Sequence, residues 1–249
     1  MVAADSEFAR VLVAAQADPR VVGLLLGGSR GKDASYVTEH SDYDAYVVVS
    51  DAGTLDEYAE RFPTRHGDPV EVILVTLDSF RKHALPGSGS EWNAYTFAHV
   101  TPLLDKLDGE ISRLAEEKSR RDPASAADPL DGYVNMYYRA AKNHRDGLTL
   151  EAHFDAAESV PWFLDFLFPA CGRVRPYNKW LRWELVNHPL PDPWSAGETE
   201  RRLQAILATG DLSEQQSLFR DVERFARELG FGDVINGWEP DIDWLRGSK

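Results

Sequence analysis

Cysteine, basic residues and long apolar runs are all scarce in this sequence. Its only cysteine, Cys171, can form no internal disulfide and has no partner for a cysteine metal cluster. No apolar run reaches the roughly 18 residues that a membrane-spanning helix needs, and the first residues, MVAADSEFARVL, lack the basic start and apolar middle of a signal peptide. We therefore expect a cytoplasmic protein with no membrane partner.

The shortage of basic residues also restricts the partners. Lys and Arg number 27 against 41 Asp and Glu, which gives a formal net charge of −14. Nucleic-acid affinity comes mainly from Lys and Arg that displace counterions, so we expect no nucleic-acid partner and no templated polymerase. A cationic partner is easier to accommodate, although net negative charge also serves solubility alone. The seven histidines form no pair at zinc-ligand spacing on a recognisable scaffold.

The clearest break in the chain is SRRDPASAADPLD, residues 119–131, which combines two prolines, small residues and charge without apolar periodicity. It predicts a linker between a domain of residues 1–118 and a domain of residues 132–249. Each is long enough to bury its own core.

The two predicted domains differ in their periodicity. The first alternates predicted helices (6–17, 54–62, 77–84 and 109–119) with predicted strands (20–26, 43–50, 69–76 and 99–106), an α/β (α+β) pattern with a small mixed sheet. In the second, apolar residues recur every three to four positions over 130–145, 150–168, 178–187, 197–209 and 213–230. That pattern predicts an all-α helical bundle.

Two aspartates stand at the start of the predicted strand in SDYDAYVVV. Side chains at i and i+2 of a strand share a face, so Asp42 and Asp44 project together. Two such carboxylates repel each other unless a cation lies between them or one is protonated. Magnesium, which prefers carboxylate and phosphate oxygen, resolves the conflict, and Glu71 in the apolar strand VEVILV is the expected third ligand.

A glycine-serine turn, GGSRGK, precedes these aspartates and follows a predicted strand. Such a turn offers backbone N–H groups, the Ser29 hydroxyl and the cations Arg30 and Lys32 to a polyphosphate. A metal on one side and amide donors on the other suit phosphoryl or nucleotidyl transfer, in which catalysis is mostly positioning and charge neutralisation.

Gly28 and Ser29, a gap of twelve residues, Asp42-Tyr43-Asp44 before apolar residues, and a later acidic strand residue at Glu71 resemble the signature of the DNA polymerase beta-type nucleotidyltransferase superfamily. A small α/β domain followed by a helical bundle is similar to the antibiotic nucleotidyltransferases that act on aminoglycosides and lincosamides. The resemblance covers residues 20–76 well, and RPYNKWLRWEL (175–185) is similar to a segment of members that have a helical domain.

The resemblance implies that Asp42 and Asp44 hold magnesium, as two ions, and that Gly28 and Ser29 meet the β and γ phosphates of ATP or another nucleoside triphosphate. Glu71 would complete the carboxylate triad. Many relatives have Asp at that place, and the longer Glu side chain either reaches a metal or serves as the base.

The helical domain offers candidates for the acceptor half of the site. Glu151, Asp155 and Glu158, spaced i, i+4, i+7, share one helix face. One of them, with Glu158 first, could act as general base, or the face could be an ordinary solvated one. Lys179, in the segment that the resemblance touches, and then Lys142 are the expected cations for the triphosphate.

The sequence thus predicts magnesium-dependent transfer of a nucleoside monophosphate, AMP first, to a hydroxyl of a small molecule, with release of pyrophosphate. An aminoglycoside-like antibiotic is the candidate acceptor. One alternative is nucleotidylation (AMPylation) of a partner protein. Another is a catalytically silent nucleotide-binding regulatory module, although silent relatives tend to lose the carboxylates. Neither the acceptor nor the choice between monomer and homodimer is fixed by the sequence.

Overall fold

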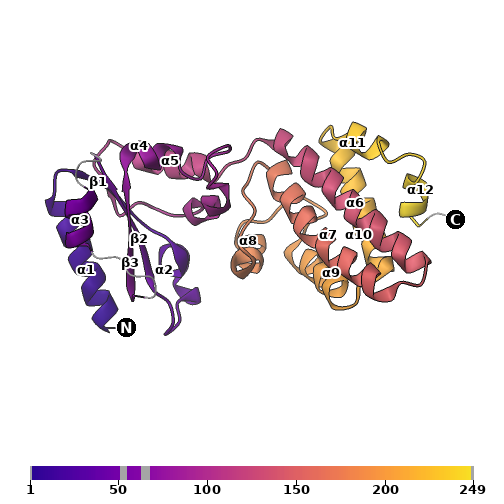
Figure 1. Cartoon of the computed structure of the whole chain (residues 1–249), viewed down its shortest axis with the longest axis horizontal. Coiled ribbons are helices and arrows are strands. Elements are labelled where there is room, and N and C mark those ends of the chain that lie inside the picture. Colours follow the sequence, from indigo (N-terminus) through magenta and orange to yellow (C-terminus); the bar gives the residue numbers. More distant parts are fainter. Residues whose placement is uncertain (1, 51–54, 63–67, 248–249) are drawn as a thin grey trace. The chain divides into compact units, whose positions relative to one another are not determined.

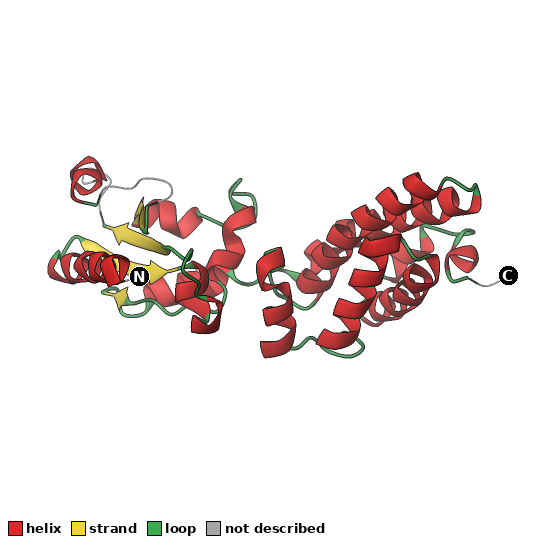
Figure 2. Ribbon diagram, turned by 90° about the horizontal axis from the view of Figure 1, so that it is seen from below, coloured by secondary structure: helices red, strands yellow, loops and turns green. Residues whose placement is uncertain are grey.

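The computed structural model describes residues 2–50, 55–62 and 68–247, and the chain divides into two compact units, Met1–Arg120 and Arg121–Lys249. Every described strand lies in the first unit (Figure 2). None of the described helices combines the length and the apolar character needed to cross a membrane.

The first unit is built on a four-stranded mixed sheet in the order β3-β2-β1-β4. Figure 1 labels its strands β1, β2 and β3. Strands β1 (Val21–Leu26) and β2 (Tyr43–Val49) are antiparallel, β2 and β3 (Val70–Thr76) are parallel, and β4 (Leu104–Asp105) pairs antiparallel with β1. The sequence predicts the first three strands closely. The predicted strand 99–106 is wrong in extent, because only Leu104 and Asp105 pair with β1.

Helices cover both faces of this sheet. Helices α1 (Val2–Ala17) and α3 (Leu55–Arg61) pack on the face that carries Tyr43, Val47 and Val49. The opposite face carries Tyr46, which packs edge-on against Phe97 at a centroid distance of 5.2 Å. That face is bordered by α4 (Leu77–Lys82), the 3₁₀ segment η3 (Glu91–Phe97) and α5 (Glu110–Lys118). Thr54, the first residue of the predicted helix 54–62, lies outside the described residues.

The glycine-serine turn is itself helical. Residues Gly28–Lys32 form the short helix α2, and the 3₁₀ turn η1 (Ala34–Tyr36) follows it. The chain therefore leaves β1 through α2 and returns on β2, which is its neighbour in the sheet.

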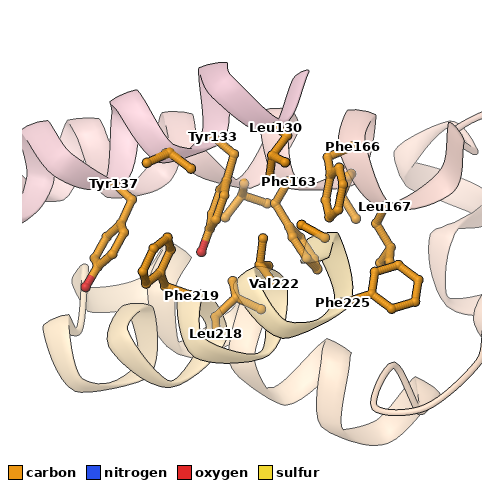
Figure 3. Close-up of a cluster of buried hydrophobic side chains, with 14 of the residues drawn as sticks. Leu130, Tyr133, Tyr137, Phe163, Phe166, Leu167, Leu218, Phe219, Val222 and Phe225 are labelled. Carbon is orange, nitrogen blue, oxygen red and sulfur yellow. The ribbon is translucent and has the colours of Figure 1, made fainter. Parts of the chain in front are cut away.

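The second unit contains the helices that the periodicity predicts, with a few additions. They are α6 (Ala127–Arg145), α7 (Thr149–Ala170), η5 (Asn178–Trp180) with α8 (Leu181–Asn187), α9 (Ala196–Thr209) and α10 (Leu212–Glu228). Two short helices near the C-terminus, α11 (Gly232–Asn236) and α12 (Ile242–Leu245), are not among the predicted ones. Figure 3 shows the core, in which aromatic and aliphatic side chains of α6, α7 and α10 interdigitate.

The boundary between the two units falls within the predicted linker, residues 119–131, but most of this segment is helical. The 3₁₀ turn η4 (Pro123–Ala126) and the first turn of α6 occupy most of it, and Leu130 is fully buried in the core of the second unit. Asp122 explains the early helix start, because its carboxylate accepts a hydrogen bond from the Ala124 N–H and Pro123 follows it at the first helical position. The two compact units meet in sequence between Arg120 and Arg121.

Candidate active site

Three carboxylates converge at the start of β2 and β3. Asp44 lies directly opposite Glu71 in the parallel register of these strands, and Asp42 stands two residues before Asp44. Each of the three offers a carboxylate oxygen, and these oxygens lie within 4.8 Å of one another. Asp42 is exposed, whereas Asp44 and Glu71 are half-buried. The cluster is therefore open to solvent on one side and fixed by strand pairing on the other.

The residues between these acids point the other way, as strand alternation requires. Tyr43 stacks on Phe8 of α1 with ring centroids 4.4 Å apart, and its hydroxyl donates to Asp5 at 2.6 Å. Burial raises the pKa of Tyr43, and the hydrogen bond to Asp5 adds to the effect. Tyr43 thus anchors the start of β2 to α1 and leaves the opposite face of the strand to the carboxylates.

The glycine-serine turn lies against this cluster. The Gly27 N–H donates to the backbone carbonyl of Asp44 at 2.8 Å. Gly28 has φ of +58°, a conformation that favours glycine, and a Cβ atom there would overlap Oδ2 of Asp44 and displace that carboxylate. The buried Ser29 hydroxyl is 3.3 Å from that of Ser41, which precedes the acidic pair.

The geometry at α2 provides donors beside the acids. The first N–H groups of a helix have no carbonyl partner within the helix, and in α2 these groups belong to the residues that the sequence assigns to phosphate. The turn and the carboxylates therefore lie against each other, and their joint role as a site stays a prediction.

Arg30 occupies a different place from the one expected of a phosphate ligand. Its guanidinium donates to the Ser41 carbonyl at 3.2 and 3.3 Å, lies 3.5 Å from the Asp5 carboxylate and stands 4.2 Å from the Tyr43 ring centroid. Tyr43, with Asp5 bonded to it, lies on the face of β2 opposite to Asp44, and only 11% of the Arg30 side chain is exposed. We therefore correct the expectation: Arg30 braces the turn against β2 and α1.

Lys32, at the end of α2, is also a bracing residue. Its ammonium donates to the backbone carbonyls of Tyr95, Thr96 and Ala98 at 3.0, 3.1 and 2.5 Å. These three bonds hold η3 and the residue after it beside the turn.

Sequence reasoning missed the contribution of η3 to this site. The Thr96 methyl group would lie 3.2 Å from a Cβ on Gly27, whose next neighbour is Cβ of Asp44. The Thr96 hydroxyl donates to Asn93 at 2.6 Å, and the Asn93 amide group donates to the Tyr46 hydroxyl at 2.7 Å and is 2.8 Å from Nε2 of His83. A buried polar network therefore supports the wall of the site. The available signal was a polar pair, Asn93 and Thr96, within an aromatic-rich stretch.

Two basic side chains beneath this wall have lowered pKa values. Burial lowers the pKa of His83, and the nearby Lys118 ammonium lowers it further. Lys118 is itself fully buried beside Phe80, at 4.7 Å from the ring centroid, and burial lowers its pKa to about 8.

The three acidic candidates of the second unit differ in their exposure to solvent. Asp155, 5% exposed, accepts a hydrogen bond from Asn143 at 2.8 Å and forms an ion pair with Arg139 at 3.0 Å, both on α6. We therefore correct its expected role: Asp155 joins α7 to α6. Glu151 and Glu158 are exposed on α7.

The two expected cations of this unit are also exposed. Lys142 lies on α6, and Lys179 lies in η5 with its ammonium 5.7 Å from the Trp180 ring centroid. Among the described residues, neither lysine forms an ion pair with an acidic side chain of α7. The role of both lysines stays a prediction.

The first unit thus combines a potential hard-metal site with a helix start beside it. Carboxylate oxygens in this number and proximity match the ligands that magnesium prefers. No family model matches the chain, and no curated protein matches it.

Proposed function

We propose that this protein is a nucleotidyltransferase, which moves a nucleoside monophosphate, AMP first, from a triphosphate to a hydroxyl of a small molecule. One observation carries the proposal: Asp42, Asp44 and Glu71 converge within 4.8 Å beside a turn whose Gly28 backbone abuts Asp44. The resemblance to the DNA polymerase beta-type superfamily, and within it to the antibiotic nucleotidyltransferases, rests on the same residues.

The carboxylate triad fits magnesium by its chemistry. It supplies three hard oxygen donors from two paired strands, and their mutual repulsion is relieved when a cation is bound. Bound magnesium would neutralise phosphate charge and make the α-phosphorus more electrophilic. Glu71 faces Asp44 directly, so it can act as a ligand in spite of its longer side chain.

The turn supports the other half of the donor site. The backbone N–H groups at Gly28 and Ser29 are the proposed donors to the β and γ phosphates, and the bonds made by Arg30 and Lys32 keep this backbone in place. A rigid donor array stabilises the charge that develops on the leaving pyrophosphate at little cost in reorganisation.

The reaction balances as follows. The acceptor hydroxyl loses a proton to a base, its oxygen forms a bond to the α-phosphorus, and the bond from the α-phosphorus to the bridging oxygen breaks so that pyrophosphate leaves. Glu158 and then Glu151 are the proposed bases because both are exposed, unlike Asp155. Lys179 and Lys142 are the proposed cations for the triphosphate.

The acidic character of the chain favours a cationic acceptor. A net charge of −14 attracts polycations over a distance of about one Debye length, roughly 8 Å at physiological salt. An aminoglycoside-like compound, with several ammonium groups and hydroxyls, meets both requirements.

The test is a mass-spectrometric screen of the whole protein with magnesium, each of the four nucleoside triphosphates, and a panel of aminoglycosides and lincosamides. The proposal expects one acceptor to gain the mass of a nucleoside monophosphate and pyrophosphate to appear in equal amount. Asp44→Asn is the matched control, and substantial turnover that survives this change would contradict the role of the triad.

The same samples test the alternative of protein nucleotidylation. If no small molecule is modified while the protein or an added protein partner gains the nucleotide mass, the acceptor is a side chain and the small-molecule proposal is wrong.

A further inference from the structure

An apolar stripe runs along the exposed side of α7, in the second unit. Leu150, Phe154, Ala157 and Pro161 follow the spacing i, i+4, i+7, i+11 and so share one helix face. Leu150 and Phe154 are each 61% exposed, and Pro161 is exposed as well. Isolated exposed apolar residues are normal, but a helix face of this length is characteristic of a surface that another element covers.

The stripe leads into a groove of about 470 Å³ within the same unit. Its apolar lining includes Ala157 and Pro161 with leucines of α8 and α9: Leu181, Leu185, Leu203 and Leu207. Two arginines also line it, and each is paired with a carboxylate: Arg182 with Glu200 at 3.5 Å and Arg175 with Asp165 at 3.0 Å. Leu207 is 49% exposed, and its backbone carbonyl lies 2.9 Å from Nε2 of His153, which fixes the end of α9 against α7. We call the stripe and this groove together the α7 groove.

One flank of the stripe carries carboxylates. Glu151 and Glu158 follow Leu150 and Ala157 by one position, are seven residues apart, and are both exposed. Asp165 continues the row after seven more residues, although it forms an ion pair with Arg175 at 3.0 Å. Glu151 and Glu158 therefore place two negative charges about two helical turns apart beside the stripe.

These features favour a particular occupant. An amphipathic helix can lay apolar side chains at i, i+4 and i+7 into such a groove, and basic residues on its flank would meet Glu151 and Glu158. A second copy of this chain fits poorly, because an antiparallel two-fold contact of α7 with itself sets the acidic flank against the acidic flank.

We propose that the α7 groove binds an amphipathic helix of another protein, one that carries Lys or Arg beside its apolar face. The α7 groove lies within the second unit, and the binding of a partner helix there goes beyond the proposed catalytic function, for which Glu158 and Glu151 are also the base candidates.

The test uses the full-length protein and a fluorescein-labelled helical peptide of about 18 residues, with leucines at i, i+4, i+7 and i+11 and lysines on one flank. The same peptide with glutamates in place of the lysines is the charge control. Fluorescence anisotropy at low and high salt reports affinity, and sedimentation velocity reports the oligomeric state of the protein.

We expect the lysine peptide to bind at least about tenfold more tightly than the glutamate peptide at low salt, and this preference to shrink as salt rises. The double variant Glu151→Lys, Glu158→Lys should invert the preference. Phe154→Ser should weaken binding of the lysine peptide about tenfold, whereas Leu229→Ser, at another exposed leucine of this unit, should not.

Several results would overturn the proposal. Absence of binding would do so, as would equal affinity for both peptides that charge reversal leaves unchanged. If Leu229→Ser weakens peptide binding as much as Phe154→Ser does, the peptide binds non-specifically and the α7 groove is not its site. Self-association that Phe154→Ser abolishes would identify a second copy of the chain as the occupant.

Discussion

Replacement of Gly28 by alanine tests whether the turn shapes the carboxylate site. Gly28 has φ of +58°, where a residue with a Cβ atom is disfavoured by about 1–2 kcal/mol. The added methyl group would also overlap Oδ2 of Asp44. The backbone cost acts on stability, while the overlap acts on the position of one proposed metal ligand.

Gly147→Ala separates these two effects. Gly147 has φ of +78°, but a Cβ atom there would meet nothing within 4 Å, and this residue lies in the turn between α6 and α7. Both variants should therefore lose about 1–2 kcal/mol in the free energy of unfolding, measured by urea denaturation. Only Gly28→Ala should disturb Asp44.

Binding of Mn²⁺, a hard cation that accepts the same oxygen ligands as magnesium, measures the disturbance without any need for turnover. Disruption of groups that orient metal ligands costs about 10–100-fold in affinity, and we expect a loss in this range for Gly28→Ala by electron paramagnetic resonance titration. Gly147→Ala should bind Mn²⁺ as the wild type does, and Asp44→Asn should lose at least as much affinity as Gly28→Ala.

Two outcomes would refute this reasoning. Wild-type Mn²⁺ affinity in Gly28→Ala, with the expected loss in Asp44→Asn, would mean that the turn does not constrain the ligand. Wild-type affinity in both variants would mean that the three carboxylates do not form a metal site.

Two further predictions concern stability. Asp155→Ala should lower the free energy of unfolding by about 2 kcal/mol, because Asn143 and the half-exposed Arg139 lose a charged acceptor. The affinity for Mn²⁺ should not change. Loss of nucleotidyl transfer at wild-type stability would instead indicate that Asp155 acts as a base. Lys118 has a pKa of about 8 when folded and 10.5 when unfolded, so the unfolded chain binds more protons between these values and stability should rise with pH there. Relative to Lys118→Met, the wild type should gain up to about 3 kcal/mol between pH 8 and 10.5 in urea denaturation, and an unchanged difference would contradict the buried charge.

The convergence of the three carboxylates could be predicted because it depends largely on local rules. Alternation along β2 places Asp42 and Asp44 on one face, and a lone acid in an apolar strand identifies Glu71. The parallel pairing that sets Asp44 opposite Glu71 cannot be read from either strand alone. It was expected because a shared metal ion would need both carboxylates close together.

The rest of this unit depends on contacts between distant segments, which periodicity does not encode. Lys32 reaches carbonyls more than sixty residues further along the chain, and Thr96 packs beside Gly27. Arg30 is a second example. Its place beside Lys32 in the turn suggested a phosphate ligand, but in the fold its guanidinium contacts Tyr43 and Asp5. A side chain's neighbours, more than its type, decide its role.

The acceptor half shows why charge spacing alone is a weak guide to catalysis on helices. The spacing i, i+4, i+7 places three acids on one broad face of α7, but a helix face has edges, and the edge nearer α6 is buried. Asp155 lies at that edge and is neutralised by Arg139, whereas Glu151 and Glu158 lie beside the exposed stripe. These two residues therefore have two proposed uses, as base candidates and as the acidic flank of the α7 groove, and the assays separate them. A pH-dependent loss of turnover in Glu158→Gln with peptide binding intact assigns catalysis, while lost selectivity for the lysine peptide at unchanged turnover assigns docking.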